Sequence, residues 1–180
     1  SRSNMPGAKG IAGPWGHKYP HVGIPGPAIG FLQECDRWFG RWLKGKKTGG
    51  EDDPPIRVFL QDGETPRPHF DARKGRWLGL PQWPSPNIRT EMLYLGDRKL
   101  LAAKTRVKPL SVCSSFTTGV TSGEWCAYGL GKVAPELAID QREDDAQSLC
   151  FDSEVLKKPV SIVGRSYVRL RVAADKPQAQ

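Results

Sequence analysis

The 180-residue chain contains no long apolar run, and its N-terminus lacks the apolar segment found in signal peptides. A helix that spans a bilayer needs roughly 18–20 consecutive apolar residues, and no stretch of the sequence approaches that length. Residues 1–7, SRSNMPG, are polar and rich in turn formers rather than apolar. We therefore expect no contact with a membrane and a cytoplasmic location.

Cysteine is scarce and scattered, which argues against a zinc site or a redox-active dithiol. The four cysteines form no C-x-x-C pair: Cys35, Cys113, Cys126 and Cys150. Cys35 and Cys150 lie in apolar stretches and are expected to be small buried hydrophobic residues. Cys113 and Cys126 could form a disulfide if their strands were neighbours, but reduced thiols are favoured in a cytosolic protein.

Histidine is scarcer still, and its spacing predicts no metal site. The chain has three histidines: His17, His21 and His69. His17 and His21 are four positions apart, but the prolines around them prevent the helix that would bring both imidazoles to one metal ion. Residues 140–145, DQREDD, lack the glycine and terminal glutamate of a calcium loop, so a solvated acidic loop is expected. We expect no metal and no cofactor.

No serine stands in the sequence context of an activated nucleophile. A G-x-S-x-G sequence places its serine on a strained turn between a strand and a helix. Residues 164–168, GRSYV, come nearest, but they lack the second glycine and begin an expected strand. Ser114 and Ser115 have no such context. Residues 129–131, GLG, have no helix after them, so they do not indicate a nucleotide site.

The composition is that of a folded, turn-rich protein. Apolar residues make up 38% of the chain, and six tryptophans supply apolar surface for a core. Twenty glycines and 16 prolines indicate many turns, short strands and few long helices. The net charge is +8, but the basic residues are dispersed along the chain. A dispersed charge is typical of a solvated surface, so nucleic-acid binding is not expected.

One amphipathic helix stands out between Pro27 and Gly45. Apolar side chains recur there every three or four positions: Ala28, Phe31, Leu32, Cys35, Trp38, Phe39, Trp42 and Leu43. Pro27 suits the first helical position, and Gly45 suits the position after the last turn. Each large side chain on this face is worth about 1.5–3 kcal/mol when buried. Too few residues precede the helix to cover the face, so we expect missing structure or self-association.

The apolar pattern changes after a polar linker at residues 46–55, KKTGGEDDPP, which we take as a boundary between residues 1–48 and 49–180. Alternating apolar residues then indicate half-buried strands, with no second helix. Strands are expected at residues 8–12, 56–61, 88–95, 100–101, 112–116, 125–130, 148–151, 160–163 and 167–172, and a loop at residues 66–86. Short strands between irregular loops are typical of an antiparallel sandwich or jelly roll.

The most suggestive feature is the nonapeptide GPWGHKYPH at residues 13–21. It places His17 on a Gly/Pro-rich turn between an apolar run and the helix. A histidine on an exposed turn can accept and return a proton near neutral pH. Among lone histidines beside tryptophan and tyrosine, a structural role is more common than a catalytic one. Catalysis would also need a hydroxyl nucleophile and an orienting acid.

The stretch GPWGHKYPH, followed by PGPAIGFLQECDRWFGRWLKG, resembles the end of the hydrolase domain in the cocaine-esterase and X-prolyl dipeptidyl-peptidase family. Further pieces resemble this family in the same order: PPIRVFLQD, RWLGLPQWP, TEMLYLGDRKL, DQREDDAQSLCFDSEVL and PVSIVGRSYVRLRVAADKPQAQ. In the family a G-P-W-x-H segment supplies the histidine of a catalytic triad. A helix ending in W-L-K-G then leads into a C-terminal jelly roll of galactose-binding-like topology.

The resemblance implies that His17 is the triad base, which takes the serine proton and returns it to the leaving group. It also implies the end of an α/β-hydrolase domain at residues 1–48 and an incomplete jelly roll at residues 49–180. The family's serine and acid precede its histidine, and only 16 residues precede His17 here. We therefore expect a C-terminal fragment of a serine hydrolase for small esters or X-Pro peptides, inactive without its upstream hydrolase domain.

A non-catalytic binding module is the alternative interpretation. Galactose-binding-like jelly rolls can hold sugars with exposed aromatic side chains, and Trp77, Trp83 and Trp125 could serve here. The histidine segment and the helix after it would have no purpose in such a module, which favours the hydrolase. The family also suggests that loops such as residues 66–86 line the acyl pocket.

Overall fold

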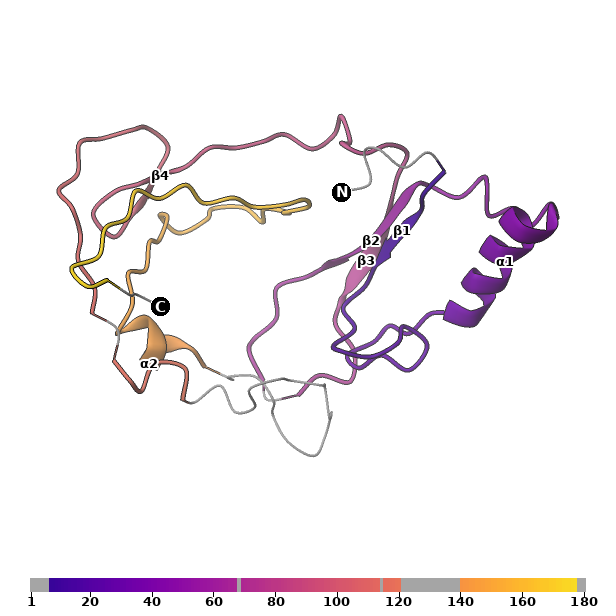
Figure 1. Cartoon of the computed structure of the whole chain (residues 1–180), viewed down its shortest axis with the longest axis horizontal. Coiled ribbons are helices and arrows are strands. Elements are labelled where there is room, and N and C mark those ends of the chain that lie inside the picture. The colour runs from indigo at the N-terminus through magenta and orange to yellow at the C-terminus, as the bar shows by residue number, and fades with distance from the viewer. Residues whose placement is uncertain (1–6, 68, 114, 121–139, 178–180) are drawn as a thin grey trace.

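The computed structural model describes residues 7–67, 69–113, 115–120 and 140–177. Within these ranges the chain forms five strands and two helices (Figure 1). In chain order they are β1 (Gly10–Ala12), α1 (Phe31–Lys44), β2 (Ile56–Gln61), β3 (Gly75–Leu80), β4 (Tyr94–Leu95), β5 (Leu100–Leu101) and α2 (Arg142–Asp145). The strands are short and the sheets are open, so the described part is rich in β-structure and has few helices.

The main sheet has the strand order β1-β2-β3. β1 runs parallel to β2, with Gly10 opposite Ile56. β2 and β3 are antiparallel, with Ile56 opposite Leu80. Parallel strands need a crossover connection, which the loop at residues 13–30 and α1 supply here. A second, two-stranded sheet pairs β4 with β5 in antiparallel fashion.

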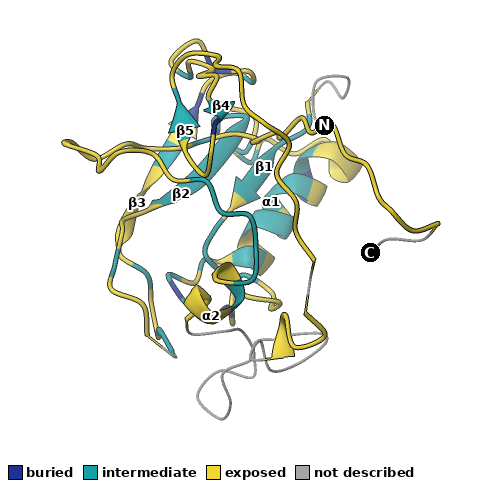
Figure 2. Cartoon of the chain, turned by 90° about the vertical axis from the view of Figure 1, so that its left-hand side faces the viewer, coloured by how far each residue is buried: buried dark blue, intermediate teal, exposed yellow. Residues whose placement is uncertain are grey.

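The three-stranded sheet and α1 lie at one end of the molecule, and β4, α2 and the C-terminal segment lie at the other (Figure 1). Residues of intermediate exposure gather on the sheet and on one side of α1, whereas the long connecting segments are exposed (Figure 2). Apart from glycines, full burial is rare among the residues described: Leu80 is 9% exposed and Ser85 is 3% exposed.

The expected helix is confirmed, although it begins at Phe31 rather than at Pro27. The chain just before the helix makes contacts outside it instead: Gly26 forms an isolated β-bridge with Ala72, and the amide of Ile29 donates to the carbonyl oxygen of Pro20. Gly45 ends the helix as its position predicts. Its φ of +64° lies in the left-handed region that favours glycine, and its amide donates a hydrogen bond to the carbonyl oxygen of Gly40.

Strand β2 is confirmed, but neither of its faces is left to solvent. The alternation places Ile56, Val58 and Leu60 on one face, and all three are half-buried. The sequence pattern assigns Arg57 to the solvent side, yet Arg57 is half-buried as well. Its guanidinium is covered because α1 packs over that face and supplies a carboxylate partner.

The prediction of a loop at residues 66–86 is wrong for the middle of that range, where β3 forms. Two glycines interrupt the apolar alternation of its sequence, GRWLGL. The pairing becomes visible only across strands: Phe59 of β2 lies directly opposite Trp77 of β3, and their rings meet edge-on with centroids 5.4 Å apart. Such cross-strand aromatic pairs stabilise a sheet by up to about 1 kcal/mol.

The strands expected at residues 148–151, 160–163 and 167–172 are wrong, because none of these residues lies in a strand. Just after the first of these segments, Asp152 forms an isolated β-bridge with Lys99. Alternating apolar and charged residues give a segment strand propensity. A strand also needs a neighbour that pairs with its backbone, and these segments have none among the described residues.

The remaining expectations have mixed outcomes. β1 and the turn that joins β4 to β5 are confirmed, but the strand expected at residues 88–95 is confined to β4. The described residues of 112–116 form no strand, and residues 125–130 lie outside the described ranges. α2 contradicts the expectation of no second helix, since a four-residue helix forms inside the acidic segment.

The main sheet crosses the linker at residues 46–55. That linker is a loop in the structure, and β1 precedes it whereas β2 and β3 follow it. The two parts of the chain on either side of the linker are therefore joined by backbone pairing as well as by the chain itself.

Candidate functional site

His17 lies on the loop at residues 13–30, which we call the histidine loop and which joins β1 to α1. Its side chain is exposed, like those of Lys18 and Tyr19 beside it. The backbone around it is held: the amide of Lys18 donates to the carbonyl oxygen of Gly16 at 2.7 Å, and the amide of Gly16 donates to that of Ile24 at 3.2 Å. The loop therefore presents an accessible imidazole on a turn of defined shape.

Trp15, two residues before His17, anchors this turn. Its indole Nε1–H donates a hydrogen bond of 2.7 Å to the carbonyl oxygen of Pro27. Gly13 and Gly23 line the ring closely, because a Cβ on either would lie 2.5 Å or 2.4 Å from indole atoms. Both glycines of this cradle are thus required by packing, and any larger residue would displace the ring.

The aromatic side chains after His17 close the loop against the start of α1. The ring of His21 stacks on that of Phe31, with centroids 6.0 Å apart and planes inclined by 7°. The ring of Tyr19 lies 6.1 Å from each of them. Such contacts add packing energy to the loop, so His21 acts as a packing residue.

The histidine loop is also joined to β3 and to the segment before it. The amide of Gly26 donates to the carbonyl oxygen of Asp71 at 2.8 Å, and the amide of Arg73 donates to that of Gly26 at 2.9 Å. The ring centroids of Trp15 and Trp77 lie 6.1 Å apart. The loop is therefore held by residues more than 40 positions further along the chain.

A charged cluster links α1 to β2 and to the linker. Arg57 of β2 donates two hydrogen bonds to the carboxylate of Glu34, from Nη1 at 2.9 Å and from Nη2 at 2.7 Å. Arg37 lies 3.0 Å from the carboxylate of Asp53. The hydrogen bonds to Glu34 raise the pKa of Arg57, so the guanidinium stays charged. The paired fork geometry fixes the orientation of the helix as well as its distance from the strand.

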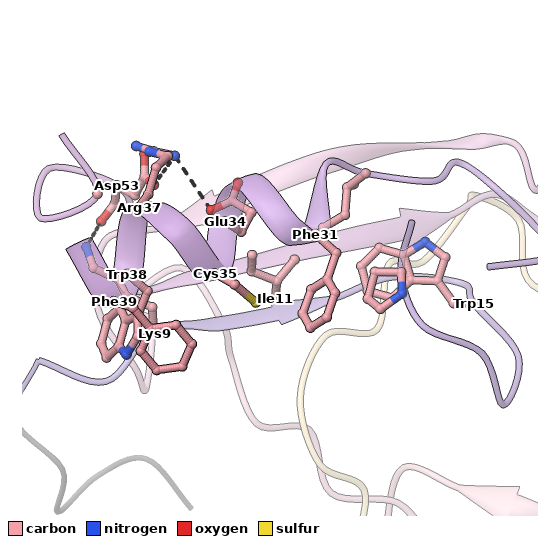
Figure 3. A pocket seen from close by; sticks show the side chains of 13 residues that line it. Lys9, Ile11, Trp15, Phe31, Glu34, Cys35, Arg37, Trp38, Phe39 and Asp53 are labelled. Carbon is pink, nitrogen blue, oxygen red and sulfur yellow. Dashed lines mark hydrogen bonds and ion pairs between the residues drawn. The ribbon is translucent and has the colours of Figure 1, made fainter. Parts of the chain in front are cut away.

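A cavity of about 330 Å³ lies between β1 and α1. Ile11 and Cys35 face each other at its centre, Trp15 lies at one end, and Trp38 and Phe39 lie at the other (Figure 3). A second cavity of about 360 Å³ borders the first and reaches Trp77. The charged cluster therefore spans a gap between helix and sheet that apolar side chains only partly fill.

The other candidate residues of the sequence have structural partners or lie outside the described ranges. His69 Nε2 lies 3.2 Å from the Asp71 carboxylate, and the hydroxyl of Ser115 bonds to that of Thr117 at 2.8 Å. Residues 164–168 form an exposed segment with no helix after it. Outside the described ranges lie Ser114, Trp125, Cys126 and residues 129–131.

Free thiols are found at Cys35, Cys113 and Cys150. Cys35 and Cys150 are half-buried, which agrees in part with the burial expected for them, and Cys113 is exposed. Desolvation, assisted by the nearby carboxylate of Asp145, raises the pKa of the Cys150 thiol. A raised pKa keeps that sulfur protonated and weakly reactive near neutral pH.

The acidic segment holds an ion pair rather than a cation site. Asp140 accepts hydrogen bonds from the backbone amide and the guanidinium of Arg142. These bonds lower the pKa of the Asp140 carboxyl to about 2. Among the described residues, no three histidine, cysteine, aspartate or glutamate side chains are placed to hold a metal ion.

Two features of the site escaped sequence reasoning. The cradle around Trp15 was signalled by the glycines that flank it, but their role depends on a ring position that only the fold shows. The contact with Trp77 joins residues 62 positions apart and leaves no local pattern.

No helix in the described part is long and apolar enough to cross a membrane.

The described part of the chain is rich in β-structure and is joined by one sheet to the histidine loop, and comparison with known families places most of it in a domain family. Residues 48–180 match the family of the X-Pro dipeptidyl-peptidase C-terminal non-catalytic domain. The chain belongs to this family, whose members are non-catalytic C-terminal domains of serine hydrolases.

Two curated relatives carry the name "Putative serine esterase", one from Mycobacterium bovis and one from Mycobacterium tuberculosis. Each is 26% identical to this chain over 181 residues, which cover 95% of this chain and 27% of the relative. The chain thus spans about a quarter of the length of the curated relatives it matches. A comparison with solved structures gave no significant match.

Proposed function

We propose that this chain is the C-terminal part of a serine hydrolase of the acyl-esterase or X-Pro dipeptidyl-peptidase kind, with His17 as general base. The observation that carries the proposal is the exposed imidazole of His17 on a turn that Trp15 anchors, in a chain of this family. In a Ser-His-Asp triad the imidazole takes the serine proton during attack on the carbonyl carbon and returns it to the leaving group. A base with this task must be held within hydrogen-bond reach of the serine.

The nucleophile, the acid and the oxyanion hole would come from an upstream hydrolase domain. The chain corresponds to 27% of its curated relatives, which leaves ample length for such a domain in a whole protein of that size. We propose that this domain also covers the apolar face of α1, where Leu32 and Leu43 remain 63% and 76% exposed. The substrate would be a small ester or an X-Pro peptide.

We also propose the end of an α/β-hydrolase domain at residues 1–48 and part of a jelly roll at residues 49–180, with the main sheet crossing this boundary. Parallel β1 and β2, joined by a crossover through α1, form a β-α-β unit of the kind that builds α/β domains. The pairs β2–β3 and β4–β5 are antiparallel, as in a jelly roll. β2 would then be the strand at which the two architectures meet.

A sugar-binding module has less support. Trp77 packs between Trp15 and Phe59, and Trp83 is half-buried. Trp77 is 38% exposed, but its contacts with Trp15 and Phe59 leave less of the ring for a sugar to stack on. The histidine loop and its anchor would also be unused in such a module.

The test is a comparison of His17→Ala with His21→Ala in a protein extended upstream to include a G-x-S-x-G segment. We expect His17→Ala to lower kcat on p-nitrophenyl acetate or Gly-Pro-p-nitroanilide by at least about 10³-fold, the order of loss for a triad member. His21→Ala, a change in the same loop, should cost far less. The 180-residue chain by itself should hydrolyse neither substrate.

Two results would contradict the proposal. Undiminished hydrolysis by the His17→Ala variant would remove this residue from the mechanism. Turnover by the 180-residue chain alone, after a contaminating esterase has been excluded with a mock purification, would show that a nucleophile lies within it.

A further inference from the structure

We propose that the domain classed as non-catalytic positions the catalytic histidine, with Trp77 of β3 as the positioning residue. This inference rests on the proposed function of His17. It assigns to residues 71–77 the task of fixing the histidine loop through one ring contact and two backbone hydrogen bonds. These residues lie inside the matched range 48–180, whereas His17 lies before it.

The first link is a row of three aromatic rings. Phe59 of β2 and Trp77 of β3 form a directly opposed cross-strand pair with centroids 5.4 Å apart. Trp77 in turn lies 6.1 Å from Trp15, with the two planes inclined by 42°. Tilted pairs at these separations are attractive beyond the area that they bury. The position of the Trp15 ring is thereby tied to the sheet.

The second link is formed by the backbone. Gly26 exchanges hydrogen bonds with the segment before β3, donating to Asp71 at 2.8 Å and accepting from Arg73 at 2.9 Å. These bonds hold the C-terminal side of the histidine loop, and the Trp15 ring holds its N-terminal side. His17 lies between the two attachments, so both ends of its turn depend on the same stretch of the C-terminal domain.

Trp15 converts the contact with Trp77 into a position for His17. Its ring is confined by Gly13 and Gly23 and bonded to the carbonyl oxygen of Pro27, so it cannot shift without moving the turn. Only Gly16 separates Trp15 from His17. A displacement of about 1 Å in a catalytic group can cost 10²-fold in rate, so a loose anchor would be costly.

The first experiment measures the loop in the 180-residue chain and needs no activity. Hydrogen exchange of the Trp15 indole N–H and the Gly16 amide is followed by NMR in wild type, Trp77→Ala, Trp77→Phe and Trp83→Ala. We expect Trp77→Ala to speed exchange at both groups roughly tenfold, the size expected when an aromatic pair is lost. Trp77→Phe should restore most of the protection, and Trp83→Ala, which removes a tryptophan of the same domain away from the loop, should leave it unchanged.

The second experiment uses the upstream-extended protein. We expect Trp77→Ala to lower kcat by about 10- to 100-fold with little change in KM, because the imidazole is misplaced while the substrate pocket remains. Trp77→Phe should recover most of kcat. A merely structural role would instead reduce the amount of folded enzyme and leave kcat per active site, titrated with an organophosphate, unchanged.

The outcomes separate this inference from the proposed function. Unchanged exchange at Trp15 and Gly16 in Trp77→Ala overturns the positioning role, even if His17→Ala abolishes hydrolysis. Faster exchange together with full activity of His17→Ala overturns the catalytic part and leaves Trp77 as a structural anchor. Faster exchange with a selective loss of kcat supports both.

Discussion

At the scale of single residues, the tryptophan that precedes the histidine determines how well its neighbour is held. Trp15 satisfies its indole N–H on Pro27 and occupies a space that Gly13 and Gly23 leave open. Glycines in a sequence are typical of a flexible turn, but here they leave room for the Trp15 ring and so allow the turn to pack closely. A loop with this construction can present an exposed side chain without being mobile.

A second residue-scale feature is the ion pair between Asp140 and Arg142 at the start of α2. It leads to a prediction of how the contribution of this pair depends on pH. The carboxyl of Asp140 has its pKa lowered from 3.8 to about 2 by hydrogen bonds from Arg142. Because the folded pKa is the lower one, the contribution of this pair is present above about pH 3.8 and is lost as the pH falls toward about 2. A carboxyl carbon titration by NMR should show this acid-shifted midpoint.

The matched variant for this titration is Arg142→Gln, which removes the charged donor. We expect the midpoint of Asp140 to return toward its ordinary value, while the carboxyls of exposed aspartates elsewhere in the chain stay where they are. An unshifted midpoint in the wild-type chain would show that the pair does not form in solution.

At the scale of elements, the helix and the sheet are joined more by charge than by apolar packing. Glu34 and Arg57 are about a quarter exposed, and their two hydrogen bonds bridge α1 and β2. We expect Glu34→Gln to lower the free energy of unfolding by about 1 kcal/mol, since the remaining carboxylate, Asp53, lies 3.8 Å from Arg57. Urea denaturation measures the change.

The control for this prediction is Glu91→Gln, which removes one negative charge at an exposed position. This variant should have the same urea midpoint as the wild-type chain within experimental error. Equal midpoints for Glu34→Gln and wild type would mean that the bridge contributes no stability, and α1 would then be held by its other contacts, including the Arg37–Asp53 ion pair.

The elements also show which parts of the fold the sequence could predict. α1 was predictable because its apolar period and its final glycine are local signals, and β2 because its alternation is local too. β3 was missed because its stabilising partner, Phe59, lies in another strand. The C-terminal strands were overpredicted because the alternation of apolar and charged residues around Leu170 indicates strand propensity but does not show that a neighbouring strand is present to pair with. For the same reason His17 could be singled out from its motif, whereas the contact between Trp77 and Trp15 could not be predicted.

At the scale of the whole molecule, α1 leaves a cluster of large apolar side chains open to solvent. Trp42 and Leu43 are 55% and 76% exposed, and Leu32 and Phe39 are 63% and 52% exposed. Clustered apolar side chains of this size tend to find a partner, so we expect the 180-residue chain to self-associate. Sedimentation velocity over a range of concentrations measures this association.

The variant that tests this expectation is the double change Leu32→Gln and Leu43→Glu, which should shift the chain toward the monomer without loss of helix signal in circular dichroism. Val155→Glu is the matched control, since Val155 is 91% exposed but lies away from the helix. Association that persists in the double variant and disappears in Val155→Glu would show that the chain self-associates through a surface other than α1.

The parallel pairing of β1 with β2 has a consequence for the order in which the molecule folds. Gly10 meets Ile56, 46 positions later, whereas β2 and β3 are separated by a much shorter connection. Short-range contacts form sooner because closing a short loop costs less entropy. During synthesis β1 and the histidine turn leave the ribosome before β2 and β3, yet they must wait for the β2–β3 hairpin before they can dock. β1 and the histidine turn are therefore made before the strands that hold them, and the imidazole reaches its place only after β2 and β3 have paired.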